Sequence, residues 1–520
     1  MSADLSPTQP GLRLLQCVVV AVFLAMATAC ASRPLNIERT ESTALADYTS
    51  TSLGRAHAQI EAEHPGQSGF SLLRYGRDAF NTRIRLIDLA EKTIDVQVYI
   101  WEGDETGRIF AERLIRAADR GVRVRALIDD LGTSARDSVL AAMDAHPNIE
   151  LRLFNPFANR GTPALDFLTD LKRVNHRMHN KIFIVDNSAA IVGGRNMGDH
   201  YFGVNQQANF RDLDMGVVGP VVRDASELFD YFWQGDWSVP MAAITVDKDA
   251  AFSIGEFTAH IRDEIAGGSY PYKLEDDLVA LDRQVAAIED RYVWASGAIV
   301  WDDPAAMAAS TTGDGDIVQK LRHKLQNIKQ SLTIESAYFV VGDGGVAQIK
   351  ALVDRGVTVR ILTNSLASND VLAAHAGHAE YRKALLKAGA NIYELRPDSA
   401  VIKKTWLGDS KAGLHTKALL FDDEAVFVGS FNLDPRSASI NTEAGIYAEH
   451  PVLARQLREY MDAGVTPQNS YRLELDEKDR LVWITQNDGV ELRYHQDPLS
   501  SFWQRFMAGF IALLPVESQL

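Results

Sequence analysis

An internal duplication constrains this chain more than any other feature of its sequence. Residues 93–101 read as a buried strand, residues 108–121 as an amphipathic helix that ends at a glycine, and the run VRVRALIDD as the next strand. The same series returns in residues 332–340, in residues 346–356 and in the run VTVRILTNS. Strands that alternate with helices in this way predict a mainly parallel sheet flanked by helices in each repeat.

Each repeat ends in the same set of polar residues. The first copy reads HNKIFIVD followed by GGRN, and the second reads HTKALLFD followed by GSFN. His179 and His415 are 236 residues apart, and the same 236 residues separate Asn196 from Asn432. A single HxKx4D segment is more often an ordinary strand end than a catalytic site, but two copies in register within a duplicated fold favour a catalytic site.

The spacing within this motif has a geometric meaning on a strand. Side chains alternate between the two faces, so a histidine and the lysine two residues later project together. We therefore expect one pocket to be lined by His179, Lys181, His415 and Lys417. The aspartates seven residues after each histidine point to the opposite face and are expected to support the site without contacting the substrate. These aspartates are Asp186 and Asp422.

The paired residues divide naturally into chemical roles. A neutral imidazole can attack phosphorus and carry a phosphoryl group covalently, while a protonated imidazole gives its proton to the departing alkoxide. The lysines and asparagines would donate to the non-bridging oxygens, which stabilises their charge without a metal or another cofactor. One histidine on each side of the phosphorus, at an interface between the repeats, would give an in-line displacement.

Each histidine also needs a carboxylate that fixes its tautomer. Asp214, in RDLDMGVVGP, and Glu443, in NTEAGIYAE, each precede a small, apolar run at a similar distance after the motif. We predict that these two residues orient the histidines.

The paired HxKx4D motifs resemble those of the phospholipase D superfamily, and the duplication covers most of residues 70–460. The runs RVNHRMHNK, GSFNLDPRS and LLPVESQL are similar to the cardiolipin synthase C subgroup of bacterial phosphatidyltransferases. This resemblance implies two α-β-α sandwich repeats with one active site at their pseudo-twofold interface. It also implies that His179 is the nucleophile and His415 the acid–base, an order that spacing alone does not assign.

The function implied by the resemblance is phosphatidyl transfer through a phosphohistidine. A glycerophospholipid loses its head-group alcohol, and a lipid hydroxyl, expected to be that of phosphatidylglycerol, accepts the phosphatidyl group to give cardiolipin. Phosphatidylethanolamine is a second candidate substrate. The alternatives are a phospholipase D hydrolase that releases phosphatidic acid, a metal-independent phosphodiesterase or nuclease, and a noncatalytic phosphate-binding protein.

Charge and cysteine content narrow these alternatives. The net charge of −16 opposes nonspecific attraction to nucleic acid, so we expect no nucleic-acid partner. The two cysteines, Cys17 and Cys30, both lie in the apolar N-terminus, which leaves no thiolate metal site in the folded body. A lysine beside each histidine would repel zinc. We predict no metal site.

The N-terminal sequence predicts that the protein is directed to a membrane. Arg13 precedes an apolar run over residues 17–27, and small residues lead to Cys30, as in a bacterial lipoprotein signal whose cysteine is lipidated. The alternative is an uncleaved signal anchor. Both place the chain in the bacterial cell envelope, membrane-associated, with its body facing the periplasm.

The remaining segments complete the expected domain organisation. The C-terminus holds a hairpin that turns at Asn487, Asp488 and Gly489, followed by a helix with an aromatic face. That helix either packs on the protein core or lies on a membrane. The expected divisions are a signal (1–30), a polar tether (31–68), a first repeat (69–237), an insertion (238–315), a second repeat (316–462) and the C-terminal hairpin and amphipathic helix (463–520).

Overall fold

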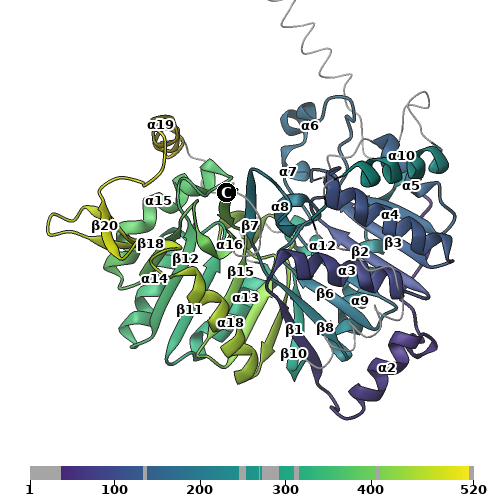
Figure 1. Cartoon of the computed structure of the whole chain (residues 1–520), viewed down its shortest axis with the longest axis horizontal. Helices are drawn as coiled ribbons and strands as arrows, with labels where there is room; N and C mark the ends of the chain where they lie inside the picture. The colour runs from purple at the N-terminus through teal and green to yellow at the C-terminus, as the bar shows by residue number, and fades with distance from the viewer. Residues whose placement is uncertain are drawn as a thin grey trace, which may run out of the picture.

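The computed structural model describes residues 37–132, 137–244, 253–268, 270–271, 292–309, 315–403 and 410–513. In this part of the chain two α/β units lie side by side, and one hydrogen-bonded ladder of strands runs through both (Figure 1). The predicted duplicated α/β fold is therefore confirmed. The predicted signal and Cys30 lie outside the described residues.

The first unit follows a short N-terminal segment and is built from alternating strands and helices. The elements of the segment and of this unit are η1 (Tyr48–Ser50), α2 (Ser52–Glu61), β1 (Ser68–Leu73), α3 (Gly76–Leu89), β2 (Thr93–Val98), α4 (Glu105–Asp119), β3 (Arg123–Asp129), α5 (Asp137–Asp144), β4 (Ile149–Phe154), α6 (Ala164–Thr169), α7 (Leu171–Val174), β5 (Ile182–Val185), β6 (Ala189–Gly193), α8 (Asp199–Phe202), β7 (Ala208–Arg211), β8 (Asp214–Val218), α9 (Pro220–Gln234), β9 (Ser238–Pro240) and η2 (Met241–Ala243).

The second unit repeats this series after α10 (Ile254–Gly267), a helix that packs on α4. Its elements are β10 (Val293–Trp301), α12 (Pro304–Ala309), α13 (Asp316–Asn327), β11 (Ser331–Ser336), α14 (Gly342–Asp354), β12 (Thr358–Asn364), α15 (Leu372–Lys387), β13 (Asn391–Leu395), α16 (Ala400–Lys403), β14 (Lys411–Leu414), β15 (Lys417–Phe421), β16 (Ala425–Gly429), α17 (Pro435–Ser439), β17 (Ala444–Glu449), α18 (Pro451–Gly464), β18 (Ser470–Leu475), β19 (Leu481–Asn487), β20 (Val490–Tyr494) and α19 (Phe502–Ile511).

The strands pair in an order that repeats between the units. The first unit has the order β9-β4-β3-β2-β5-β6-β8-β1. The second has the order β10-β17-β16-β15-β11-β12-β13-β18-β19-β20. The strands β1 and β10 pair antiparallel, with Gly69 opposite Trp294, and so join the two units.

The sheet is mixed, so the prediction of a mainly parallel sheet is wrong. Only β2-β3-β4 and β11-β12-β13 are parallel in the main ladder of the described residues. The motif strands return through hairpins, which force antiparallel pairing. Their tight turns place Asp186 at φ 51° and Asp422 at φ 48°, in the left-handed region that aspartate tolerates better than most residues.

Three domain boundaries differ from the expected ones. The strand β10 pairs with β17 as β1 pairs with β8, so the second repeat begins at Val293 and not at residue 316. Likewise β9 pairs with β4 as β18 pairs with β13, so β9 belongs to the first repeat and β18 to the second. These strands at the limits of the repeats are short or weakly patterned, so the periodicity of the sequence does not reveal them.

The expected polar tether at 31–68 is partly folded. Residues 40–44 lie against the first unit, where Arg152 donates to Thr40 O at 2.7 Å and Arg125 donates to Ser42 O at 2.7 Å. Further along, α2 buries Leu53 and His57. Polar composition suggested a free linker, but buried arginines of the sheet provide the donors that these backbone carbonyls need.

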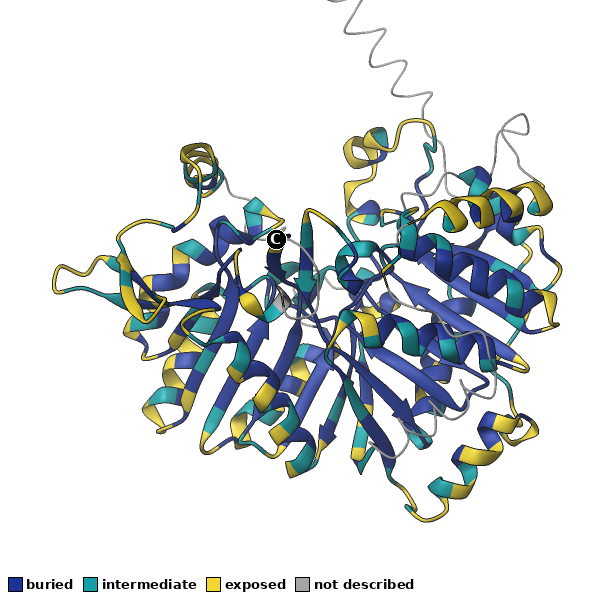
Figure 2. Cartoon of the chain, in the orientation of Figure 1, coloured by how far each residue is buried: buried dark blue, intermediate teal, exposed yellow. Residues whose placement is uncertain are grey.

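Helices cover both faces of the ladder, and the strands between them are almost entirely buried (Figure 2). On one face, α9 and α18 pack into a single apolar core that contains strand residues from both units. Both helices begin with a proline at the first position, Pro220 and Pro451, where a missing N–H costs nothing. This shared core fixes the two units against each other.

Candidate active site

The two motif histidines lie where the units meet. In the first unit Ile182 of β5 stands opposite Gln97 of β2, so His179 lies just past the carboxyl end of β2. Its backbone N–H donates to Thr442 O of the second unit at 2.9 Å. The second unit mirrors this arrangement, because the His415 N–H donates to Arg211 O of the first unit at 2.8 Å.

The carboxylate beside His179 comes from the opposite repeat. The His179 Nδ1 atom lies 2.8 Å from Glu443 Oε2 and 3.0 Å from Oε1, and both side chains are buried. A carboxylate in this position holds the proton on Nδ1 and leaves the Nε2 lone pair free. The structure therefore brings together His179 and Glu443, as expected for an orienting pair.

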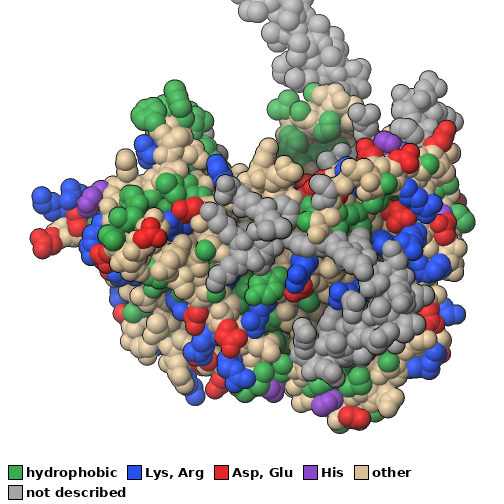
Figure 3. Space-filling view, in the orientation of Figure 1, with side chains coloured by type: hydrophobic (Ala, Val, Ile, Leu, Met, Phe, Trp, Pro, Cys, Tyr) green, Lys and Arg blue, Asp and Glu red, His purple; other side chains and the backbone are tan. Residues whose placement is uncertain are grey.

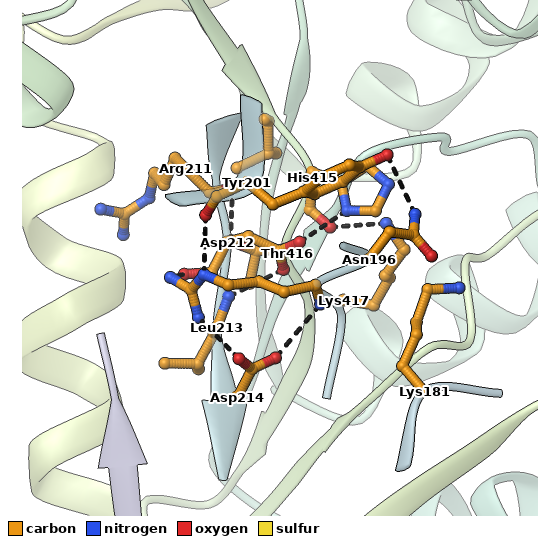
Figure 4. A network of polar contacts seen from close by, with 12 residues as sticks. Lys181, Asn196, Tyr201, Arg211, Asp212, Leu213, Asp214, His415, Thr416 and Lys417 are labelled. Carbon is orange, nitrogen blue, oxygen red and sulfur yellow. Dashed lines mark hydrogen bonds and ion pairs between the residues drawn. The ribbon is translucent and has the colours of Figure 1, made fainter. Parts of the chain in front are cut away.

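The partner of His415 is Asp212, which the sequence reading missed. His415 Nδ1 lies 2.6 Å from Asp212 Oδ2, again across the boundary between the repeats (Figure 4). The predicted orienter Asp214 lies at the opposite end of this network, where its carboxylate pairs with Arg83 at 3.0 Å and Arg195 at 3.2 Å. The assignment of Asp214 is thus corrected to Asp212.

The pairing register of the sheet explains why the sequence predicted Asp214 in place of Asp212. Asp212 and Asp214 are two residues apart, so periodicity puts both on the same face of an extended chain. Asp214 stands opposite Gly193 in the first unit, and Gly445 stands opposite Gly429 in the second. Counting back two residues from each makes Asp212 the counterpart of Glu443. Only an alignment anchored on these strands would have found it.

The two lysines lie beside their histidines, as the spacing predicts. Lys181 Nζ donates to His179 O at 2.6 Å, and Lys417 Nζ donates to His415 O at 2.5 Å. Figure 4 shows Lys181 from the first unit near Lys417 from the second. Burial lowers the pKa of both ammonium groups, and each lysine also lowers the pKa of His179.

The two asparagines are buried but held differently. The Asn196 amide donates to Tyr201 Oη at 2.9 Å and accepts from the Ile100 N–H at 3.2 Å. The Tyr201 ring in turn lies edge-on to the His415 ring, with centroids 5.1 Å apart. Asn432 is also buried, and its Oδ1 has no hydrogen-bond partner among the described residues. Asn196 is therefore held in place by the protein, whereas Asn432 keeps one polar atom unsatisfied.

The two motif aspartates accept backbone N–H groups and stabilise the strands that carry the site. Asp186 accepts the N–H groups of residues 91, 92 and 93 at 2.8–2.9 Å, where β2 begins. Asp422 accepts those of residues 329, 330 and 331 at 2.7–2.9 Å, where β11 begins. Each carboxylate thus ties the end of a motif strand to the start of the neighbouring strand, away from the histidines.

Two further residues position the histidines and were not predicted. Asp129, at the end of β3, accepts the Met178 N–H at 2.8 Å. Asn364, at the end of β12, accepts the Leu414 N–H at 2.8 Å. Each holds the residue just before a motif histidine. Both could have been found in the sequence, because each repeat has a polar residue at the end of the same parallel strand.

Electrostatics distinguishes the two histidines. Burial lowers the pKa of His179 well below its ordinary value, and the charges of Lys181, Lys417 and His415 lower it further. The effect of His415 on the pKa of His179 indicates that the two imidazoles lie within electrostatic reach of each other. Burial also lowers the pKa of His415, but the Asp212 carboxylate opposes that shift.

The two orienting carboxylates differ as well. Burial raises the pKa of Glu443 to about 7, against the lowering effect of Lys181. Burial alone would raise the pKa of Asp212 too, but His415 and Lys417 bring it below its ordinary value. Asp212 is therefore ionised at neutral pH, whereas Glu443 titrates near neutrality.

Comparison with known proteins identifies relatives over nearly the whole chain. A family model described as "Cardiolipin synthase, PLD-like domain" matches residues 84–233 and 321–464. Cardiolipin synthase C of Escherichia coli (strain K12) is 38% identical over 475 residues, which make up 89% of this chain and 99% of the relative. An uncharacterized protein of Helicobacter pylori (strain J99) is 34% identical over 477 residues, 90% of this chain and 93% of that protein.

One solved structure shows the same fold at low sequence identity. The crystal structure of phosphatidylserine synthase from Haemophilus influenzae Rd KW20 matches with a TM-score of 0.56 and 16% identity. The match covers 89% of this chain and 100% of that chain. The overall fold of this chain is therefore shared with that structure.

Proposed function

This chain belongs to the family of cardiolipin synthases with PLD-like domains, and from that premise we propose that it transfers a phosphatidyl group between phospholipids. One observation carries the mechanism: each motif histidine is buried against a carboxylate of the other repeat, at 2.8 Å for His179 and 2.6 Å for His415. Two oriented imidazoles at one interface suit a two-step displacement at phosphorus.

In the first step His179 attacks the substrate. Its Nε2 lone pair forms a bond to the phosphorus of a glycerophospholipid, and the bond from phosphorus to the head-group oxygen breaks. His415 gives its proton to the departing alkoxide, which leaves as an alcohol. The product is a phosphatidyl group held covalently on His179.

In the second step a lipid hydroxyl takes the phosphatidyl group. His415, now neutral, removes the proton of that hydroxyl, whose oxygen attacks phosphorus as the bond to His179 breaks. With phosphatidylglycerol as the acceptor the product is cardiolipin. Lys181, Lys417, Asn196 and Asn432 would donate to the non-bridging oxygens, whose negative charge must be held through both steps.

The charges of the site support this division of roles. A bound phosphodiester is negative and favours one proton on the pair of imidazoles. His415 holds that proton better, because the Asp212 carboxylate stabilises an imidazolium and the pKa of His179 is lowered further by its neighbours. His179 then stays neutral, as a nucleophile must.

We also propose where the enzyme works. Its relatives include bacterial cardiolipin synthases, and its substrates are phospholipids, so a membrane-associated bacterial protein is expected. No helix among the described residues is long and apolar enough to cross a bilayer. We infer an anchor in the N-terminal signal, lipidated at Cys30, with the body facing the periplasm. Labelling cells with radioactive palmitate, with Cys30→Ser as the control, tests this anchor.

The runner-up activity is hydrolysis, in which water replaces the lipid hydroxyl in the second step. Both reactions share the first step, so the same residues would serve either one. Incubation of the purified chain with phosphatidylglycerol, with and without phosphatidylethanolamine, followed by separation of the lipid products, distinguishes them. Cardiolipin supports transfer, and phosphatidic acid as the sole product would overturn it.

A further inference from the structure

Two short elements of this protein expose several large apolar side chains while polar contacts hold each element in place. The first is the α6–α7 segment of the first unit, and the second is the C-terminal helix α19. Soluble proteins scatter single apolar residues over their surface, but they rarely collect large ones on one exposed element. The two elements therefore need a separate explanation.

The α6–α7 segment is held by buried polar contacts. Asp166 is 1% exposed and accepts the Ala158 N–H at 2.6 Å, while Asn155 donates to the backbone of residues 173 and 176 at 2.9 and 2.8 Å. In contrast, Leu168 is 75% exposed and Leu171 is 53% exposed. A fixed element with its aspartate inside and its leucines outside presents those leucines to something other than water.

Helix α19 also exposes large apolar side chains on a segment that polar contacts hold in place. Its start carries a capping box between Ser501 and Gln504, and Arg505 donates to Ser500 O at 2.6 Å. Just before it, Asp497 pairs with Arg382 of α15 at 2.9 Å and pins the segment. The outward face holds large apolar side chains that are 40–68% exposed, namely Phe502, Trp503, Phe506, Met507 and Phe510. Of the two placements expected for this helix, packing of the aromatic face on the core is therefore excluded for the described residues.

Both elements lie at the edge of the sheet that carries the histidines. The α6–α7 segment follows the carboxyl end of β4 and leads directly into His179. Helix α19 packs on α15, which follows the carboxyl end of β12. In Figure 1 both project from the same side of the molecule, one from each unit, and Figure 3 shows apolar side chains on both projections. The catalytic interface lies between them.

We propose that these two elements insert together into the surface of a phospholipid bilayer and bring the histidine pair to its lipid substrate. Trp, Phe and Leu side chains favour the boundary between head groups and acyl chains. The net charge of −16 gives no attraction to an anionic surface, so apolar insertion must supply the affinity of these two elements for the bilayer. This inference rests on the proposed function, which supplies the lipid substrate.

Site-specific labels test this docking in the full chain. In a His179→Ala, Cys17→Ser, Cys30→Ser background, a polarity-sensitive fluorophore is attached at Leu168→Cys, Phe506→Cys or Val490→Cys, and vesicles of phosphatidylglycerol and phosphatidylcholine are added. Val490 is the control, because it is 61% exposed but lies on the β19–β20 hairpin, which projects to another side of the molecule than α6 and α19 (Figure 1). Emission at 168 and 506 should shift to the blue, also in high salt, while emission at 490 should not.

Two outcomes would overturn the docking. In one, the chain binds vesicles through its N-terminus while the labels at 168 and 506 stay in water, and in the other it does not bind at all. Because the labelled chain lacks His179, this result is independent of catalysis. Labels that stay in water, while the chain with His179 intact transfers phosphatidyl groups, would overturn the docking alone. Labels that enter the bilayer, while the chain with His179 intact shows no transfer, would overturn the proposed function alone.

Activity on two forms of substrate provides the second readout. The variants Leu168→Glu/Leu171→Glu and Phe506→Glu/Phe510→Glu should lose about tenfold or more of their turnover on vesicles. Turnover of dispersed short-chain phosphatidylglycerol should stay unchanged, as should that of Val490→Glu on both substrates. Equal loss on both forms of substrate would show damage to the fold and contradict docking.

Discussion

His179 and His415 each contact a carboxylate of the opposite repeat through Nδ1, at 2.8 and 2.6 Å, yet those carboxylates have pKa values shifted in opposite directions. Duplication explains the common geometry, because the same strand register delivers Glu443 and Asp212 to the interface. The difference comes from the surroundings. One backbone arrangement can thus support two chemical roles once the buried charges around each copy diverge.

The surroundings of His179 and Glu443 hold further buried acids whose pKa values are raised. Near His179, burial raises the pKa of Asp129 and of Asp434 to about 6 and that of Asp302 to about 7. Asp302 also accepts the Glu443 N–H at 3.2 Å. Where the first unit has Asp129 at a strand end, the second has the uncharged Asn364. Burial keeps Glu443 easy to protonate, whereas His415 and Lys417 keep Asp212 ionised.

Replacing the two histidines should have the largest effect on activity and should show whether their roles differ. His179→Ala should lower the rate of transfer by about 10⁴-fold or more, because no covalent intermediate can form. His415→Ala should cost about 10²- to 10⁴-fold but still form the phosphatidyl enzyme. Brief exposure to phosphatidylglycerol labelled in its acyl chains, followed by electrophoresis, should show label on His415→Ala only. Label on His179→Ala instead would reverse the two roles.

A second pair of substitutions separates Asp212 from Asp214. Asp212→Asn should lower kcat by about 10²- to 10⁴-fold with little change in Tm, since it removes the charge that supports a protonated His415. Asp214→Asn should instead lower the free energy of unfolding by about 3–5 kcal/mol, because it leaves Arg83 and Arg195 without their buried partner. Steady-state kinetics and thermal unfolding of both proteins check this, and the reverse pattern would restore Asp214 as the orienter.

The pH dependence of the reaction should sharpen the difference between the carboxylates. Burial raises the pKa of Glu443 to about 7. As pH falls through that value the carboxylate becomes protonated and no longer accepts the proton of His179 Nδ1. We expect kcat/KM to decline about tenfold per pH unit below about 7. In the Glu443→Gln protein, kcat/KM should be lower at high pH and should not show this decline. An unchanged acid limb in Glu443→Gln would assign the titration to another group.

The smallest effects are expected at the two motif aspartates. Asp186→Asn should lower the free energy of unfolding by about 2 kcal/mol and Asp422→Asn by about 1 kcal/mol, because Asp186 is fully buried and Asp422 is nearer the surface. Denaturant unfolding measures both. Burial alone would raise the pKa of Asp422, but three backbone N–H groups lower it below its ordinary value. Its stabilisation is therefore present above that ordinary value and is lost as pH falls below it.

Much of this site could be predicted from the sequence because it depends on local spacing. The doubled motif indicated the histidines, the lysines and a duplicated α/β fold, and the odd spacing of Asp186 and Asp422 placed them away from the pocket. Asp212 was missed because choosing it over Asp214 needs the pairing of β8 with β6, a long-range contact. The position of β10 and the folding of residues 37–61 also depend on partners far along the chain.

The exchange of carboxylates between the repeats has a consequence for how the chain can be divided. A fragment ending before Val293 would keep His179 but lose Glu443, and the complementary fragment would keep His415 but lose Asp212. Neither fragment would hold even one correctly oriented imidazole. Recombination that trades one repeat between diverged relatives would separate matched partners, so the halves must be inherited as a set.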